Sequence, residues 1–151
     1  MESQVQWLTA QEERLWRGWL RLNAEFASTL QRELHQDVGL SMQDFEVLVH
    51  LTDNPEGRVR VTELAGLLQW ERSRVSHHIT RMQGRGLVER VECSEDGRGA
   101  FVVITPQGRS AIEEAAPGHV MAVRRLMFDV LNEEEKAALA AVIDKLLADG
   151  G

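Results

Sequence analysis

Tyrosine is absent from this chain of 151 residues, and cysteine occurs once, as Cys93. A single cysteine excludes a disulfide within the chain and a structural zinc site built from several cysteines. No apolar run approaches the roughly 20 residues that a membrane-spanning helix needs. Residues 1–13 also lack the basic and then apolar pattern of a secretion signal. We therefore expect a globular protein of the cytoplasm.

Motifs of catalysis and metal binding are missing as well. The sequence holds no glycine-rich phosphate loop and no recognisable serine, histidine and aspartate arrangement. His77 and His78 are adjacent, so on a helix they point about 100° apart and make a poor chelate. We expect no enzyme, no cofactor and no metal, although a metal site assembled in space from His35, His50 and His119 is left open.

Negative charge dominates the composition, with a formal net charge of −7. Taken alone, this value argues against a nucleic-acid partner. Residues 72–85, however, contain four arginines and neither aspartate nor glutamate. Because salt screens charges beyond about 8–10 Å, a basic segment on an acidic body can still bind phosphates.

Hydrophobic periodicity predicts a long helix at each end of the chain. From near Thr9 to near Asp37, apolar side chains recur every three or four residues and line one face. One short lobe cannot bury so long a stripe, which suggests a partner chain. A second long helix is expected over residues 106–130, with a kink or interruption at Pro117-Gly118. A last helix, capped by Asn132, is expected to end near residue 148.

The central part of the chain, residues 41–105, predicts short helices and a hairpin. Ser41 caps the first helix and an Asn-Pro-Glu-Gly turn ends it. A very short strand is expected at residues 59–61, and Thr62 is expected to cap a third helix over residues 63–68. The next helix docks through an apolar stripe of Val75, Ile79 and Met82 and ends around residues 84–86. Two strands then flank an Asp-Gly turn and form a β-hairpin.

Two short helices with a tight turn between them, followed by a hairpin, form the plan of a winged helix-turn-helix. A single helix fits the DNA major groove, where its exposed side chains meet the base edges. The helical wheel places Ser73, His77, Thr80 and Arg81 opposite the docking stripe, flanked by Arg74 and Ser76. Arg98 at the hairpin tip lies between two glycines and suits the minor groove or a phosphate.

These residues resemble the MarR family of bacterial transcriptional regulators. The resemblance covers residues 9–148 and rests on three stretches: Leu64-Ala65, the run from Arg72-Ser73-Arg74-Val75-Ser76-His77-His78-Ile79 to Arg85-Gly86-Leu87-Val88-Glu89-Arg90, and the wing element Asp96-Gly97-Arg98 that precedes Phe101 and Thr105-Pro106. His77 and His78 depart from common family residues. The family often has an apolar residue in place of His78, so this side chain is expected to be half-buried.

The resemblance implies a homodimer whose terminal helices interlock and whose two lobes bind a pseudo-palindromic DNA site. It implies that Asp96 braces the wing through an ion pair. It also implies a small aromatic or phenolic ligand between the dimer helices and the lobe, for which Trp16, Trp19 and His50 are the candidates. Aromatic residues at helical spacing are more often core residues, and Cys93 in a strand is more often a half-buried residue than a redox sensor.

We therefore expect a mainly α fold with a small β wing, in which a winged helix-turn-helix lobe (residues 41–105) joins long dimerisation helices (9–38 and 106–148) in one domain. The predicted function is that of a ligand-responsive repressor. The predicted DNA contacts are Arg72, Ser73, Arg74, Ser76, His77, Thr80, Arg81 and Arg98. A winged-helix interaction module without a DNA role, or a metal-responsive regulator, remains the alternative.

Overall fold

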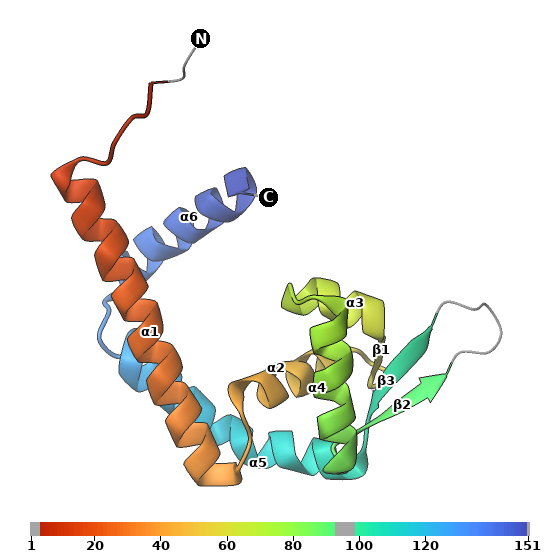
Figure 1. Ribbon diagram of the computed structural model, residues 1–151. Helices are drawn as coiled ribbons and strands as arrows, with labels where there is room; N and C mark the ends of the chain where they lie inside the picture. Colours follow the sequence, from red (N-terminus) through yellow and green to blue (C-terminus); the bar gives the residue numbers. More distant parts are fainter. Residues whose placement is uncertain (1–3, 93–98, 151) are drawn as a thin grey trace.

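Two arms joined at a base give the chain its shape (Figure 1). The computed structural model describes residues 4–92 and 99–150. The elements follow one another as α1 (Ala10–Val38), α2 (Met42–Asp53), β1 (Arg58–Arg60), α3 (Val61–Leu68), α4 (Arg72–Gly84), β2 (Val88–Glu92), β3 (Ala100–Ile104), α5 (Pro106–Val123), the π-helical η1 (Arg124–Phe128) and α6 (Glu133–Gly150). Helix α1 forms one arm, the winged lobe from α2 to β3 forms the other, and α5 runs along the base. The mainly α fold with a small β wing is confirmed.

Local capping chemistry fixes where the first two helices begin. Thr9 and Glu12 form a capping box, in which each side chain accepts a hydrogen bond from the other residue's backbone N–H. Ser41 and Asp44 form the same arrangement at the start of α2. Helix α1 ends at Gly39, whose positive φ of 69° is the left-handed conformation that glycine adopts without strain. The predicted bounds of both helices are confirmed.

The sheet of the lobe has the strand order β1-β3-β2, with both pairs antiparallel. Val59 lies opposite Val102, and Val88 lies opposite Ile104. The predicted hairpin is confirmed, but two details at β1 are wrong. The strand ends at Arg60, because Val61 already belongs to α3. Thr62 therefore lies inside the helix and does not cap it, and Arg60 takes the N-cap position without a side-chain hydrogen bond.

The core of the lobe lies between α4, α2 and the sheet. Val75, Ile79 and Met82 are fully buried, which confirms the predicted docking stripe. They pack in one cluster with Leu48 of α2 and Val102 of β3. This burial fixes the rotation of α4, so that its other face is turned to solvent.

The start of α5 is packed tightly against the end of the wing. The Thr105 hydroxyl accepts a hydrogen bond from the Gly108 N–H at 3.0 Å and donates one to the Gly86 carbonyl at 2.6 Å. Gly108 is buried, and a Cβ there would overlap the backbone carbonyl oxygen of Leu87. Backbone leaves little room to adjust, so this position requires glycine.

Gly108→Ala should therefore destabilise the protein by about 3 kcal/mol, the upper end for overpacking a tight site. Gly66→Ala in α3 is the matched control, since nothing lies within 4 Å of its added Cβ. The control should stabilise the helix by up to about 1 kcal/mol. Chemical denaturation of both variants measures the difference, and equal stabilities would contradict the tight packing.

Helix α5 is not interrupted at Pro117-Gly118, contrary to one of the two predicted outcomes. The α-helix continues to Val123, and the irregular π-helical turn follows at residues 124–128. A proline removes one backbone hydrogen bond, but α5 packs along α1 and buries Ile112, Ala115 and Ala122. We infer that this packing holds the helix through the proline.

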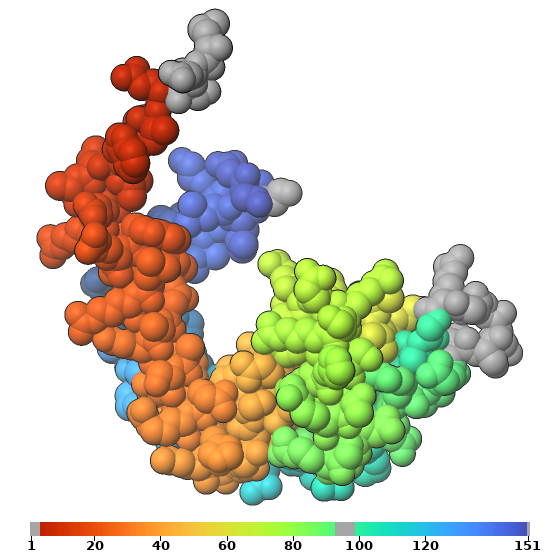
Figure 2. Space-filling view, viewed as in Figure 1, coloured from red at the N-terminus to blue at the C-terminus, as the bar shows by residue number. Residues whose placement is uncertain are grey.

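Large apolar side chains remain exposed on the two end helices. Trp16 and Trp19 of α1 are 53% and 47% exposed. Contrary to the expectation, these tryptophans therefore do not pack in the core of the single chain. Helix α6 has no buried residue at all, and it projects from the rest of the chain (Figures 1 and 2). Among residues 4–92 and 99–150, no helix has both the length and the apolar character to cross a membrane.

Candidate nucleic-acid interface

The exposed face of α4 carries most of the predicted contact residues. Arg72, Ser73, Arg74, His77, Thr80 and Arg81 are all exposed. Ser73, His77, Thr80 and Arg81 share the side of the helix opposite the buried stripe, with Arg72 and Arg74 beside them. No acidic side chain occurs within α4. The structure thus presents a basic and hydroxyl-bearing helix face to solvent, which is the chemistry that base edges and phosphates accept.

Ser76 differs from the other predicted contacts. It is only partly exposed, and the Arg90 guanidinium of β2 donates to its carbonyl at 3.1 Å and to its hydroxyl at 3.0 Å. These bonds tie the wing to α4. The backbone N–H of Arg90 also donates to the side chain of Gln83 at 2.9 Å. Asp96 and Arg98, the two wing predictions, lie outside the described residues, as does Cys93.

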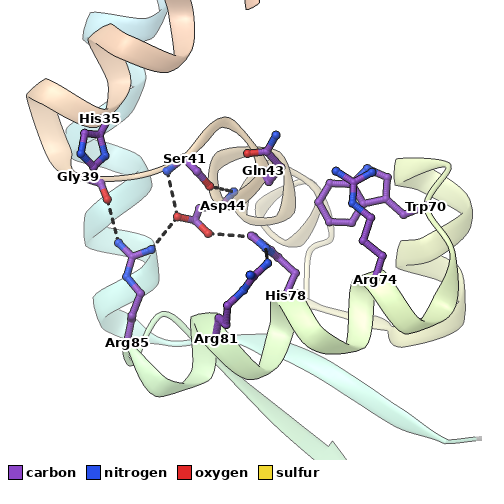
Figure 3. A pocket seen from close by; sticks show the side chains of 10 residues that line it. All are labelled: His35, Gly39, Ser41, Gln43, Asp44, Trp70, Arg74, His78, Arg81 and Arg85. Carbon is purple, nitrogen blue, oxygen red and sulfur yellow. Dashed lines mark hydrogen bonds and ion pairs between the residues drawn. The ribbon is translucent and has the colours of Figure 1, made fainter. Parts of the chain in front are cut away.

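Arg74 and Arg81 lie against two aromatic side chains, Trp70 and His78 (Figure 3). The Arg74 guanidinium lies 4.0 Å from the ring centre of Trp70. Arg81 lies with its Nη2 3.2 Å from Nδ1 of His78. Trp70 in turn meets His78 edge-on, with ring centres 5.6 Å apart. An aromatic pair therefore supports both arginines from beneath.

His78 is 8% exposed, so it is more deeply buried than predicted. Its Nε2 lies 2.9 Å from Oδ1 of Asp44, a carboxylate that is 3% exposed. The Arg85 guanidinium donates from Nη1 to the other carboxylate oxygen, Oδ2, at 2.7 Å. Its Nη2 also donates to the Gly39 carbonyl at 2.9 Å. The cluster joins α4 to the corner between α1 and α2.

Several hydrogen bonds stabilise the charged form of Asp44. Burial alone would raise the pKa of this carboxyl. The hydrogen bonds from His78, the Ser41 backbone and Arg85, together with the positive charge of Arg85, outweigh burial and hold the pKa well below its usual range. Asp44 is therefore a buried anion that holds the start of α2 against α4.

The ion pair also corrects the charge count of residues 72–85. The sequence shows four arginines without an acid, but Arg85 is paired with Asp44 from a different helix. Arg72, Arg74 and Arg81 are the arginines of α4 itself. The spacing of Ser41 and Asp44 predicted a helix cap, and nothing in it indicated that the same carboxylate also binds α4.

A cavity of about 570 Å³ opens beside this cluster. Its lining comes from the end of α1, the start of α2 and the inner side of α4: His35, Gly39, Ser41, Gln43, Asp44, Trp70, Arg74, His78, Arg81 and Arg85 (Figure 3). The candidate ligand residues Trp16, Trp19 and His50 do not line it. They remain predictions that this cavity does not support.

The three histidines considered for a metal site have separate surroundings. His119 lies against Phe45 with ring centres 4.5 Å apart, and burial lowers its pKa. His35 lines the 570 Å³ cavity, which contains neither His50 nor His119. Within residues 4–92 and 99–150, no group of three or more histidine, cysteine, aspartate or glutamate side chains is arranged to hold a metal.

A helix docked by one face and basic on the other, followed by an antiparallel hairpin of β2 and β3 that pairs with β1, defines a winged helix-turn-helix lobe. The MarR family profile matches residues 38–99. The crystal structure of Sco3205, a MarR family transcriptional regulator from Streptomyces coelicolor in complex with DNA, is 36% identical, with a TM-score of 0.91 over 99% of this chain and 92% of that one. AbsC from the same organism is also 36% identical, with a TM-score of 0.90 over 96% and 97%.

A curated relative, the HTH-type transcriptional repressor YetL of Bacillus subtilis, is 28% identical over 64% of this chain. That match spans 58% of the repressor's own length. Taken with the two Streptomyces structures, the comparisons show that this chain belongs to the MarR family. It is a DNA-binding transcriptional regulator.

Proposed function

We propose that the protein acts as a homodimer on a pseudo-palindromic operator and represses transcription from it. The observation that carries this proposal is the division of α4 into a fully buried apolar stripe and an exposed basic face. Such a helix can enter the major groove without disturbing the core. Two copies reach both half-sites when their recognition helices stand about 34 Å apart or at a multiple of that spacing.

The dimer would be built from the end helices. Leu15, Trp16 and Trp19 of α1 are 47–66% exposed, and Leu146 and Leu147 of α6 are 64% and 71% exposed. Large apolar side chains left exposed in such number on two helices are typical of an interaction site. A second copy of the chain would cover these faces and would hold the two lobes at a fixed separation. Without a second lobe at this fixed separation, a single recognition helix gains little sequence specificity for DNA.

Within the contact face, Arg74 and Arg81 are the proposed base-reading residues. Both are exposed, and their guanidinium groups lie against Trp70 and His78 respectively. Arginine donates two parallel hydrogen bonds to the acceptors of guanine. Arg72, Ser73, His77 and Thr80 are the proposed phosphate or secondary base contacts, and Ser76 is proposed to contribute through its anchored hydroxyl. Arg98, braced by Asp96, is proposed for the minor groove.

Arg74→Ala and Arg81→Ala should each weaken specific operator binding by about 1–3 kcal/mol, or roughly 5- to 150-fold. Arg21→Ala is the matched control, because Arg21 is an exposed arginine of α1 that pairs only with Glu25 on its own helix. The control should change binding by less than about twofold, since salt screens its charge from the DNA face. Mobility-shift titrations on a selected operator measure all three variants.

Binding-site selection from random DNA supplies that operator and tests the proposal directly. The expected product is an inverted repeat with half-sites one or more helical turns apart. Failure to enrich any sequence would favour the alternative of a winged-helix interaction module without a DNA role. Unchanged operator binding in both arginine variants would show that α4 is not the reading helix.

The proposed response to a signal starts from the family of the protein. We infer that a small aromatic or phenolic ligand shifts the separation of the lobes and lowers DNA affinity through linkage. The 570 Å³ cavity between α1, α2 and α4 has the size and mixed polarity of a small-molecule site. We further propose that the protein works in the cytoplasm without enzymatic activity. A metal-responsive regulator is the less favoured alternative.

A further inference from the structure

We propose that His78 is a positioning residue that sets the base preference of Arg81, acting from beneath the DNA-contact face. This inference rests on the proposed contact between Arg81 and DNA. His78 itself is 8% exposed, so its ring cannot read a base. Its influence on DNA recognition has to pass through the side chains that it touches.

Both ring nitrogens of His78 are engaged. Nδ1 lies 3.2 Å from Nη2 of Arg81, and Nε2 lies 2.9 Å from Oδ1 of Asp44. A guanidinium group can only donate hydrogen bonds, so Nδ1 must accept. The ring proton therefore sits on Nε2, which lies within ion-pair distance of the carboxylate. His78 thus links Arg81 on one side of its ring to Asp44 on the other.

Asp44, which faces Nε2 of His78, is held in a fixed position. Asp44 is 3% exposed, and its Oδ2 accepts from the Ser41 backbone at 3.0 Å and from Arg85 at 2.7 Å. Arg85 is anchored in turn on the carbonyl of Gly39 at 2.9 Å. An imidazole fixed in this way cannot turn freely, and it holds the acceptor for Arg81 in one direction.

The His78 ring is also in contact with Trp70. Trp70 meets His78 edge-on and carries the guanidinium of Arg74 on its face at 4.0 Å. The pair of rings therefore restrains both of the proposed base-reading arginines. Holding a long side chain in its binding geometry before DNA arrives reduces the entropy lost on binding. The geometry assigns His78 a role in specificity in addition to its packing.

Two conservative variants separate the contacts of the ring. The amide of His78→Gln reaches the position of Nε2, so it keeps the bond to Asp44 and loses the acceptor for Arg81. The shorter amide of His78→Asn reaches the position of Nδ1, so it can accept from Arg81 but loses Asp44. We expect the glutamine variant to melt close to the wild type and the asparagine variant to melt at a lower temperature.

Binding-site selection on the two variants and on Arg81→Ala gives the decisive measurement. The glutamine variant should lose preference at the base pairs where Arg81→Ala loses it, by about tenfold or more. The double variant His78→Gln/Arg81→Ala should be no worse than Arg81→Ala alone, because the two changes remove one interaction. The asparagine variant should keep the wild-type preference once its folded fraction is matched.

A purely structural role for His78 predicts a different result. It predicts a uniform loss of affinity at all positions in both variants and additive effects with Arg81→Ala, and either result would overturn the inference. If Arg81→Ala reduces preference while His78→Gln does not, only the inference fails. If neither Arg74→Ala nor Arg81→Ala reduces preference, the proposed reading helix fails and the inference fails with it.

Discussion

A variant with Ile143→Glu and Leu147→Glu is expected to be monomeric and to bind the full operator about 10²–10⁴ times more weakly than the wild type. Both side chains lie on one stripe of α6, at positions i and i+4, and they are 36% and 71% exposed in the single chain. Covering them with a second copy requires an apolar partner surface. Two buried carboxylates would each have to lose their hydration there, which costs far more than the contacts return.

The loss in affinity follows from the geometry of two linked lobes. When one lobe binds its half-site, the second lobe is held close to the other half-site, and this proximity raises overall affinity by 10²–10⁴ without a new contact. A monomer keeps its basic α4 and retains only the affinity of one half-site. Light scattering coupled to gel filtration gives the mass, and a mobility shift with full and half operators gives the affinities.

The matched control is Ala141→Glu with Ala148→Glu. These alanines lie on the opposite side of α6, as judged by the 100° turn per residue, and the pair adds the same charge to the same helix. This control should remain dimeric and bind the operator like the wild type. A dimeric Ile143→Glu/Leu147→Glu protein with full operator affinity would show that α6 is not part of the interface.

The second large effect is expected for Asp44→Ala, which should lower the free energy of unfolding by about 3 kcal/mol. Removing this carboxylate leaves Arg85 and the buried His78 without this partner, and it removes the Asp44 half of the capping box of α2. Breaking a buried pair typically costs 3–5 kcal/mol. The lower end applies because the Arg85 side chain is 48% exposed and regains water. Urea denaturation at neutral pH measures the change.

Asp129→Ala provides the control for this change. Asp129 pairs with Arg124 at 3.3 Å, but both side chains are 58% exposed. An exposed pair contributes between 0 and about 1 kcal/mol, so this variant should unfold close to the wild type. Equal losses of unfolding free energy in the two variants would contradict the view that burial makes the ion pairs of Asp44 more stabilising than an exposed pair.

The same carboxylate predicts how stability depends on pH. Because the pKa of Asp44 is lowered in the folded protein, its contribution is complete above the ordinary carboxyl value of about 4. The contribution is lost as the pH falls below that value toward the lowered pKa. Asp44→Asn should therefore flatten the acid side of the stability profile below about pH 4 and reduce stability at pH 7.

The sequence predicted those parts of the fold that local patterns control. Hydrophobic periodicity placed α1, and the capping residue Ser41 placed the start of α2. The spacing of Val75, Ile79 and Met82 gave the buried side of α4. The prediction that Thr62 caps α3 was wrong because the chain enters the helix directly from β1. A residue with good capping chemistry therefore lies inside the helix. The sequence predicted a kink or an interruption at Pro117, but α5 continues through it, which we attribute to packing against α1.

The candidate site was predictable only in its exposed half. A helical wheel identifies which side chains point away from the core, and it found Arg74 and Arg81. The supporting half brings together Asp44 of α2, Trp70 of the turn and His78 of α4. Asp44 is separated from His78 by two other elements along the chain. Such contacts depend on how α2 packs against α4, and no local pattern records that packing.

The absence of buried residues in α6 has a consequence for how the protein is made. A helix of 18 residues that gains nothing from its own chain's core is only marginally stable in water. On the homodimer proposed above, the final stage of folding is then a bimolecular reaction, and protomer concentration becomes a variable of stability. Newly synthesised chains would keep a loose, protease-sensitive end until they meet a second copy. The cell would thereby remove dilute single subunits and retain the paired form that occupies the operator.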